Sequence, residues 1–229
     1  MRALVTGAGG FVGAHLVGRL VGDGWDVVGT VRPGGSTDRL AALEVAASVE
    51  VVPVDLADPA ATAALAAGSG CDVAFLLAAA RGATAPADRR VTAAVNGESG
   101  RWLVEALPLR CRVVVRLGSS TEYGQQAGPM DEDAPLRPRG FFGTTKAAGS
   151  RAVAAAAAER GLRCAVLRAF QVYGPLDHPG RLVPSALQAA RTGTVLPLTE
   201  AGRRRDWVFV DDVVAVSYTH LTLPTKRIV

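Results

Sequence analysis

The stretch TGAGGFVG at residues 6–13 decides the fold of this chain. It follows the short apolar run ALVT at 3–6 and opens an apolar segment with helical spacing. Gly7, Gly10 and Gly13 lie three residues apart, which lets the chain turn sharply, bring backbone close to a pyrophosphate and pack a helix tightly on a strand. The N–H groups of a helix N-terminus favour such an anion. We therefore predict a dinucleotide site with contacts here from Gly7, Gly10, Phe11, Val12 and Gly13.

Strand-like and helix-like segments alternate through most of the chain. The strand-like segments are continuous apolar runs, which is typical of a parallel sheet that is buried on both faces. Such alternation predicts an α/β fold, a Rossmann-type doubly wound parallel sheet. We expect strands at 3–6, 26–31, 49–54, 72–77, 112–118 and 162–170, and helices at 11–22, 37–46, 59–67, 87–106 and 144–160.

The alternation stops after Pro175, where we expect only a helix at 183–191 and a strand at 207–210. The last residues are Thr-rich and lose the Ala/Arg/Gly/Val composition of the rest, and they interrupt a helix expected from Asp211 onward. They are interpreted as a non-native tail; the alternative is a divergent C-terminal strand. The predicted domains are a dinucleotide-binding Rossmann domain at 1–175, an incomplete C-terminal substrate lobe at 176–216 and the tail at 217–229.

Composition and charge exclude several classes of partner. The chain has 229 residues, a net charge of +4, 49% hydrophobic residues and 20% charged residues, which is typical of a globular protein. Its densest basic run, Arg203–Arg205, is followed at once by Asp206 and has no interleaved aromatic residues, so we expect no nucleic-acid partner. Glycines interrupt the apolar segments at 3–22 and 60–80, so we expect no membrane span or signal peptide.

The cysteines and histidines give no sign of a disulfide framework or a metal site. Cys71, Cys111 and Cys164 are odd in number, far apart and set in apolar stretches, which is typical of buried free thiols in a reducing compartment. The three histidines show no spacing that suits a metal. We therefore expect a cytoplasmic protein without a bound metal.

The residue after the second strand favours one form of the dinucleotide. The segment GTVRPGG at 29–35 has Arg32 where an acid would accept a hydrogen bond from the 2′-hydroxyl of an NAD ribose. A planar guanidinium suits a 2′-phosphate instead, with Arg39 as a second donor. Arg32 thus predicts NADP(H) over NAD(H); the alternative is an ordinary surface arginine in an arginine-rich chain.

Seven motifs in order resemble the extended short-chain dehydrogenase/reductases, in particular the NAD(P)-dependent epimerase/dehydratase family. They are TGAGGFVG, VDLAD (54–58), LLAAA (76–80), GSSTEYG (118–124), FGTTK (142–146), LRAFQVYGP (167–175) and RRDWVFVDDVV (204–214). The resemblance covers residues 1 to 216 and is strongest to NADPH-dependent reductases of nucleotide-activated 4-keto-6-deoxy sugars. It implies an enzyme that reduces or epimerises such a sugar by hydride transfer, that binds a nucleotide-sugar substrate and that can form a homodimer.

The resemblance also assigns catalytic positions. In this family a tyrosine transfers the hydroxyl proton, a lysine one turn later lowers the pKa of that tyrosine and holds the nicotinamide ribose, and a Ser or Thr binds the reacting oxygen. Ser119 and Lys146 match two of these, but Phe142 occupies the tyrosine position. Phenylalanine has no proton to give, so we expect impaired chemistry with binding retained. Tyr123, a water or Ser119 could supply the proton, and the alternative function is a catalytically silent NADP-binding module.

The remaining site residues are carried over position by position. Asn96 matches an asparagine that supports the proton path, although a lone polar residue equally caps or bridges local structure. Dehydration is disfavoured because the only acid in GSSTEYG is Glu122, not the residues directly after Ser119. The implied cofactor contacts are Asp55, Leu56, Leu77, Ala78, Ala79, Asn96 and Lys146, and the implied substrate contacts are Ser120, Gln171 and Arg205.

Overall fold

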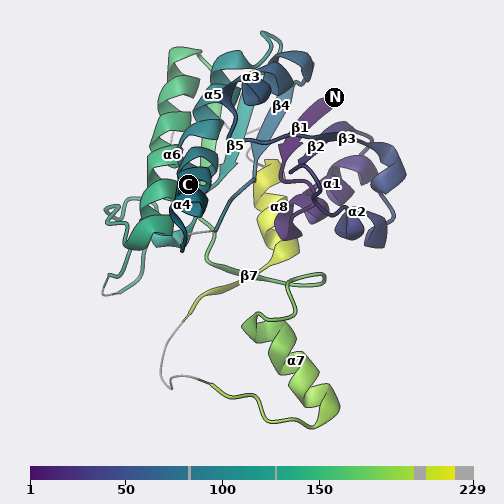
Figure 1. Cartoon of the computed structure of the whole chain (residues 1–229), viewed down its shortest axis with the longest axis vertical. Coiled ribbons are helices and arrows are strands. Elements are labelled where there is room, and N and C mark those ends of the chain that lie inside the picture. Colours follow the sequence, from purple (N-terminus) through teal and green to yellow (C-terminus); the bar gives the residue numbers. More distant parts are fainter. Residues whose placement is uncertain (82–83, 127, 199–204, 220–229) are drawn as a thin grey trace.

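Six parallel strands form the central sheet, in the order β3-β2-β1-β4-β5-β6. The computed structural model describes residues 1–81, 84–126, 128–198 and 205–219. Helices α3, α5 and α6 cover one face of the sheet and α1, α2 and α8 the other (Figure 1). The strand order reverses direction between β1 and β4, which confirms the predicted Rossmann-type doubly wound sheet.

The predicted elements are present, most with shifted ends. The helix expected at 37–46 is only half that length, Asp38–Ala42, and the helix expected at 87–106 is divided by a π-helical segment. The strands of the sheet are β1 (Arg2–Thr6), β2 (Asp26–Val31), β3 (Val49–Pro53), β4 (Val73–Leu76), β5 (Val113–Leu117) and β6 (Arg163–Leu167). The α-helices of the body are α1 (Phe11–Gly22), α2 (Asp38–Ala42), α3 (Pro59–Gly68), α4 (Pro86–Ala93), α5 (Ser99–Ala106) and α6 (Gly140–Glu159). Three short segments are η1 (Ala46–Ser48), η2 (Ala94–Glu98, π-helical) and η3 (Ser120–Glu122).

The apolar strands separate two hydrophobic cores, one on each face of the sheet. Leu16 and Leu20 of α1 are fully buried in the first core, and Leu103 and Val153 of α5 and α6 are buried in the second. Side chains alternate between the two faces along each strand, so apolar residues are favoured at successive positions in the middle of the sheet. This explains why the strands read as unbroken apolar runs.

The segment after β6 leaves the body and then returns to it. β7 (Gln171–Tyr173) and β8 (Trp207–Phe209) form a small parallel sheet, and α7 (Leu182–Thr192) lies on an arm below the body (Figure 1). No residue of α7 is buried. α8 (Val210–Thr219) then packs against α1, and its Val214 joins the first core.

The expectation that this last helix breaks off after residue 216 is wrong, because α8 continues through Thr219. The Ser217 hydroxyl donates to the Val213 carbonyl at 2.7 Å, and the Tyr218 ring lies 6.0 Å from the Trp25 ring. These contacts give the first residues of the predicted tail a place in the helix. Residues 220–229 of that tail lie outside the described residues.

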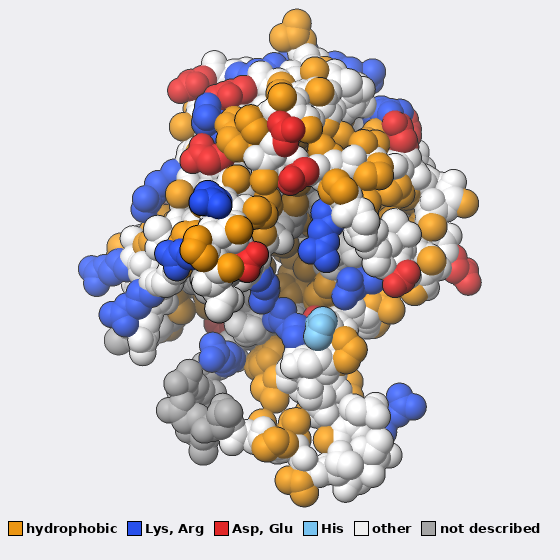
Figure 2. Space-filling model, in the orientation of Figure 1, with side chains coloured by type: hydrophobic (Ala, Val, Ile, Leu, Met, Phe, Trp, Pro, Cys, Tyr) orange, Lys and Arg blue, Asp and Glu red, His pale blue; other side chains and the backbone are white. Residues whose placement is uncertain are grey.

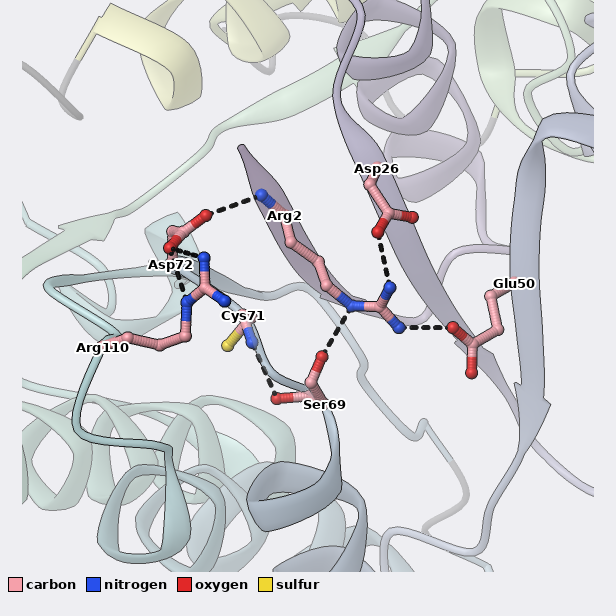
Figure 3. Close-up of polar contacts among 7 residues, drawn as sticks. All are labelled: Arg2, Asp26, Glu50, Ser69, Cys71, Asp72 and Arg110. Carbon is pink, nitrogen blue, oxygen red and sulfur yellow. Dashed lines mark hydrogen bonds and ion pairs between the residues drawn. The ribbon is translucent and has the colours of Figure 1, made fainter.

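Arg2 ties the amino ends of the strands together, at the end of the sheet opposite the glycine loop (Figure 3). Its guanidinium forms ion pairs with Asp26 of β2 and Glu50 of β3 and donates to the Ser69 carbonyl, while its backbone N–H donates to Asp72 at 2.8 Å. One side chain therefore holds three strands and the turn before β4 in register. The carboxyl ends of the strands remain for a functional site.

The structure shows the state of the cysteines and was searched for membrane-spanning helices and metal-ligand clusters. All three cysteines are free; Cys71 and Cys111 are buried, whereas Cys164 is only partly buried. Within the described parts of the chain, no helix is long and apolar enough to cross a membrane. The same residues include no group of three His, Cys, Asp or Glu side chains that could hold a metal ion.

Candidate active site

The glycine loop has no room for side chains at its first and last glycines. Gly7 has a φ of +72°, and a Cβ there would lie 2.9 Å from the Ala78 Cα. A Cβ on Gly13 would lie 2.1 Å from the Gly7 carbonyl oxygen. The N-cap residue of α1, Gly10, has no side chain to cap the helix, which leaves the first N–H groups of α1 for an external acceptor. The loop therefore fits the diphosphate of a dinucleotide.

The loop after β4 is held beside the glycine loop. The Thr6 hydroxyl accepts hydrogen bonds from the Leu77 and Ala78 N–H groups at 3.1 and 3.2 Å. Leu77 and Ala78 are partly buried and Ala79 is exposed, so this predicted cofactor segment borders the open side of the sheet. Two of the predicted cofactor segments thus lie in contact.

Asn96 joins this loop to the lysine-bearing helix. Its amide oxygen accepts from the Ala80 N–H at 2.9 Å, and its amide nitrogen donates to the Ala80 carbonyl at 2.9 Å and to the Thr145 hydroxyl at 3.3 Å. Asn96 is fully buried on the π-helical segment η2. Of the two readings of this residue, the structure places it as a bridge; its side chain positions other segments and does not face open space.

Phe142 and Lys146 lie on one face of α6, four residues apart. This helix begins at Gly140, four residues before the predicted start, and therefore includes Phe142. The Arg81 guanidinium carbon lies 5.5 Å from the centre of the Phe142 ring. The ring offers a face for a cation but no proton.

The Lys146 ammonium is buried beside the end of β5. Lys146 is 3% exposed, and its Nζ donates to the Leu117 carbonyl at 2.6 Å. The pKa of Lys146 is lowered to about 7, chiefly by burial and also by the positive charges of Arg116 and Arg81, while Glu122 acts in the opposite direction. Near neutral pH this side chain can therefore exist as an ammonium or as a neutral amine.

Ser119 follows β5 and presents a hydroxyl whose oxygen is already an acceptor. It accepts from the Thr121 N–H at 3.2 Å and from the Thr121 hydroxyl at 2.8 Å. A serine hydroxyl has one proton to donate as well. The Ser119 hydroxyl can therefore accept both hydrogen bonds from Thr121 and still donate its proton to another acceptor.

Tyr123 and Glu122 are buried in the protein and are therefore poorly placed to act as an acid in the active site. Tyr123 is 3% exposed, and its hydroxyl accepts from the Arg168 guanidinium at 3.3 Å while its ring stacks on Phe170. Glu122 is fully buried. This geometry does not favour Tyr123 as a substitute proton donor, and it leaves Glu122 unable to reach a substrate.

The residues predicted around the ribose differ in their surroundings. Arg32 is exposed at the end of β2, and Asp55 is exposed with its carboxylate accepting from the Ala57 N–H at 2.9 Å; Leu56 beside it is buried. Arg39 donates from Nε to the Leu176 carbonyl and from Nη1 to the Gly9 carbonyl, so it holds the glycine loop. A guanidinium has five N–H donors, so both Arg32 and Arg39 stay candidates for a 2′-phosphate.

The predicted substrate contacts lie on the side towards the arm. The Ser120 N–H donates to the Ala169 carbonyl at 3.0 Å. The Gln171 N–H donates to the carbonyl of Asp206 at 3.1 Å, which brings Gln171 beside the residue that follows Arg205. Figure 2 shows Lys and Arg side chains gathered on the lower part of the body, above the arm, with a hollow between the two.

Sequence reasoning missed the buried charged residues beneath this site. Arg116 is 3% exposed in the middle of β5, and Arg168 has a side chain that is 8% exposed. The available signal was a lone arginine inside the apolar run VVVRLG, because arginine is rarely buried without a partner.

The buried amine predicts a specific dependence of stability on pH. In the unfolded chain Lys146 has an ordinary pKa of 10.5, so between about pH 7 and 10.5 the unfolded state binds a proton that the folded state does not. The free energy of unfolding should therefore rise with pH in this window, by up to about 1.4 kcal/mol per unit from this group. Lys146→Met should remove that rise. Urea denaturation of both proteins at a series of pH values measures the difference; parallel curves would contradict the burial of the amine.

The glycine loop at the end of β1, within a doubly wound parallel sheet, defines a protein of the Rossmann class. Residues 3–228 match the NAD dependent epimerase/dehydratase family, and the chain belongs to that family. UDP-glucose 4-epimerase of Mycolicibacterium smegmatis is 35% identical in an alignment 225 positions long, which covers 93% of this chain and 71% of that protein. The dTDP-glucose 4,6-dehydratase of Streptomyces griseus is 31% identical, over 92% of this chain and 66% of that protein.

Solved structures share the fold over nearly the whole chain. A tyrosine-to-phenylalanine mutant of UDP-glucuronic acid 4-epimerase from Bacillus cereus, in complex with UDP-4-deoxy-4-fluoro-glucuronic acid and NAD, has a TM-score of 0.84 and 25% identity, covering 100% of this chain and 75% of that one. UDP-glucose 4-epimerase from Thermotoga maritima with UDP-glucose has a TM-score of 0.85 and 24% identity, covering 97% of this chain and 74% of that one.

Proposed function

We propose that this chain binds a nicotinamide dinucleotide and a nucleotide-activated sugar, and that it carries out reduction or epimerisation at a sugar carbon slowly for want of a phenolic proton donor. The observation that carries this proposal is the continuous set of contacts from the glycine loop through Ala78, Ala80 and Asn96 to the helix of Lys146. These contacts support a single scaffold for both the diphosphate end and the reaction end of one elongated ligand.

Each residue of the site has one role in this proposal. A bound nicotinamide would supply hydride transfer to or from the sugar carbon. Lys146 as an ammonium holds the ribose hydroxyls, and Ser119 donates a hydrogen bond to the reacting sugar oxygen. Phe142 shields that oxygen from water without exchanging a proton. General acid–base catalysis typically contributes about 10²–10⁴-fold, which is the size of the expected deficit.

The finer proposal is an NADP(H)-dependent reductase of a 4-keto-deoxy sugar, with the arm and the β7–β8 pair as part of its substrate lobe. The free guanidinium of Arg32 supports NADP(H), whereas the Bacillus cereus neighbour was solved with NAD. That neighbour is a tyrosine-to-phenylalanine mutant which holds both NAD and a UDP-sugar. It supports the idea that loss of a phenol leaves binding intact in this fold.

Arg32→Asp tests the cofactor part of the proposal. We expect the dissociation constant for NADPH to rise about tenfold or more, because a carboxylate repels the 2′-phosphate, while that for NADH changes little. Fluorescence titration of the reduced dinucleotides measures both constants. Arg163→Asp serves as a control with an unchanged ratio of the two constants, since it makes the same charge change at an exposed arginine at the amino end of β6, away from the glycine loop. An unchanged ratio in Arg32→Asp would remove Arg32 from the ribose site.

A catalytically silent dinucleotide-binding module is the second candidate. Phe142 favours it, and so does the engagement of the Tyr123 hydroxyl by Arg168. The presence of Ser119 and Lys146, which form hydrogen bonds with Thr121 and Leu117, favours an active enzyme. Incubation of the wild-type chain with NADPH and a dTDP-4-keto-6-deoxy sugar separates the two: slow, enzyme-dependent oxidation of NADPH supports the enzyme, and binding without turnover supports the module.

A further inference from the structure

Four charged side chains are buried together beneath the Ser119–Lys146 site. Glu122 is fully buried, Arg116 and Lys146 are each 3% exposed, and the Arg168 side chain is 8% exposed. Only Glu122 among them is an acid. Burying an isolated charge costs free energy, so we examined which contacts stabilise these four groups in the protein interior.

Glu122 connects three elements through its carboxylate. Its Oε1 accepts from the Ser119 N–H at 2.9 Å and from the Ser150 hydroxyl of α6 at 3.0 Å, and its Oε2 forms an ion pair with Arg168 at 3.3 Å. The carboxylate reaches this place because Gly118 has no side chain: a Cβ there would lie 2.7 Å from Oε1. Glu122 therefore fixes the backbone of Ser119 against α6.

Arg116 is held in a slot between α5 and α6. A Cβ on Gly149 would lie 2.3 Å from its Nη2, and a Cβ on Gly100 would lie 2.8 Å from its Nη1. Its Nη2 donates to the Asn96 carbonyl at 2.5 Å, but its buried Nε has no hydrogen-bond partner among the residues that the structure describes. Burial lowers the pKa of Arg116 to about 10, so the guanidinium still carries its charge at neutral pH.

The Lys146 amine is close to both groups through residues 116–118. Its Nζ binds the carbonyl of Leu117, which follows Arg116 on β5, and the Glu122 carboxylate packs against Gly118, the next residue. Ser150, one turn further along α6, binds Glu122. The charged groups that act on Lys146 are Arg116 from β5, Glu122 from η3 and Arg81 from the loop after β4, and Arg168 reaches Glu122 from the end of β6.

We propose that Glu122 and Arg116 are positioning residues with opposite effects on Lys146: the carboxylate favours its ammonium form and the guanidinium favours its neutral form. The meaning of this balance rests on the proposed function, in which the ammonium form holds the ribose hydroxyls. The balance itself is a property of the ligand-free protein. It can be tested whether or not the chain has an activity.

The composition of the chain makes the test direct. Lys146 and Lys226 are its only two lysines, so protein labelled isotopically at lysine Cε gives two NMR signals, and Lys226→Arg identifies that of Lys146. Titrating this signal in the Lys226→Arg background should show a pKa of about 7. Glu122→Gln should shift that midpoint down, and Arg116→Gln should shift it up, each by about one unit or more.

Two further variants keep the proposal falsifiable if a substitution weakens the fold. Glu122→Asp retains the negative charge and should keep the midpoint closer to the wild-type value than Glu122→Gln does. Glu159→Gln removes an exposed carboxylate at the far end of α6 and should leave the midpoint unchanged. Circular dichroism confirms that each titrated variant is folded.

The outcomes separate this inference from the proposed function. Opposite shifts in Glu122→Gln and Arg116→Gln support the inference, whereas shifts of the same sign, or none, in folded variants overturn it. The pH dependence of NADPH affinity is then compared in the same variants. If the NMR midpoints move but no dinucleotide binds at any pH, the charge balance stands and the proposed function fails.

Discussion

Phe142→Tyr is expected to raise the rate of sugar-nucleotide conversion by about 10²–10⁴-fold. The new hydroxyl would lie one helical turn from Lys146, whose positive charge favours the phenolate and so lowers the pKa of the phenol. Ser119 would complete the set of groups around the reacting oxygen. The rate is measured from the absorbance of reduced nicotinamide, with wild type and variant at equal concentration.

Phe141→Tyr is the matched control for this gain. Phe141 is the adjacent residue on α6, and the Arg89 guanidinium carbon lies 4.1 Å from its ring centre, so a hydroxyl there faces a different direction from that of Phe142. We expect no gain from it. If Phe142→Tyr binds dinucleotide as the wild type does and still shows no gain, the missing phenol is not what limits the chemistry.

Gly13→Ala is expected to abolish dinucleotide binding and to destabilise the fold by about 3 kcal/mol. The added Cβ would lie 2.1 Å from the Gly7 carbonyl oxygen and 3.2 Å from the Ala8 Cα, and backbone atoms cannot move aside as a flexible side chain can. α1 must then shift away from the loop, and its N–H groups no longer converge on the diphosphate. Urea denaturation and fluorescence titration with NADPH measure the two effects.

Gly18→Ala is the control in the same helix. A Cβ on Gly18 would meet only the Leu43 Cδ1, at an ordinary 3.9 Å. Alanine is the better helix former, so this variant should be more stable by about 0.5–1 kcal/mol and bind dinucleotide normally. Equal effects of the two substitutions would mean that the close contact at Gly13 is unimportant.

Much of the fold could be predicted because the segments that are apolar in the sequence are the strands and helices that are buried in the structure. The second strand, predicted at 26–31, is Asp26–Val31, and the first helix, predicted at 11–22, is Phe11–Gly22. Both are apolar segments whose ends are marked by glycines or charged residues. The positions of Ser119 and Lys146 beside the carboxyl end of β5 also followed from their motifs.

The unpredicted features depend on tertiary contacts. α6 begins at Gly140 without a side-chain cap, so the sequence has no N-cap residue that would predict where this helix starts. The π-helical turn at 94–98 carries Asn96, which is held by the backbone of Ala80, sixteen positions earlier in the chain. The burial of Arg116 depends on two glycines from two different helices. A single sequence shows none of these contacts, although Arg116 stands out as a lone arginine in the apolar run VVVRLG.

The most direct test of the account is a titration of the wild-type chain with NADPH and NADH, followed by fluorescence of the reduced nicotinamide. We predict that one dinucleotide binds saturably to each chain. Gly13→Ala should abolish this binding and Lys146→Met should weaken it at least tenfold, because both ends of the site contribute. Binding that depends on Gly13 but not on Lys146 would limit the site to the diphosphate. No saturable binding by the folded wild-type chain would contradict the account.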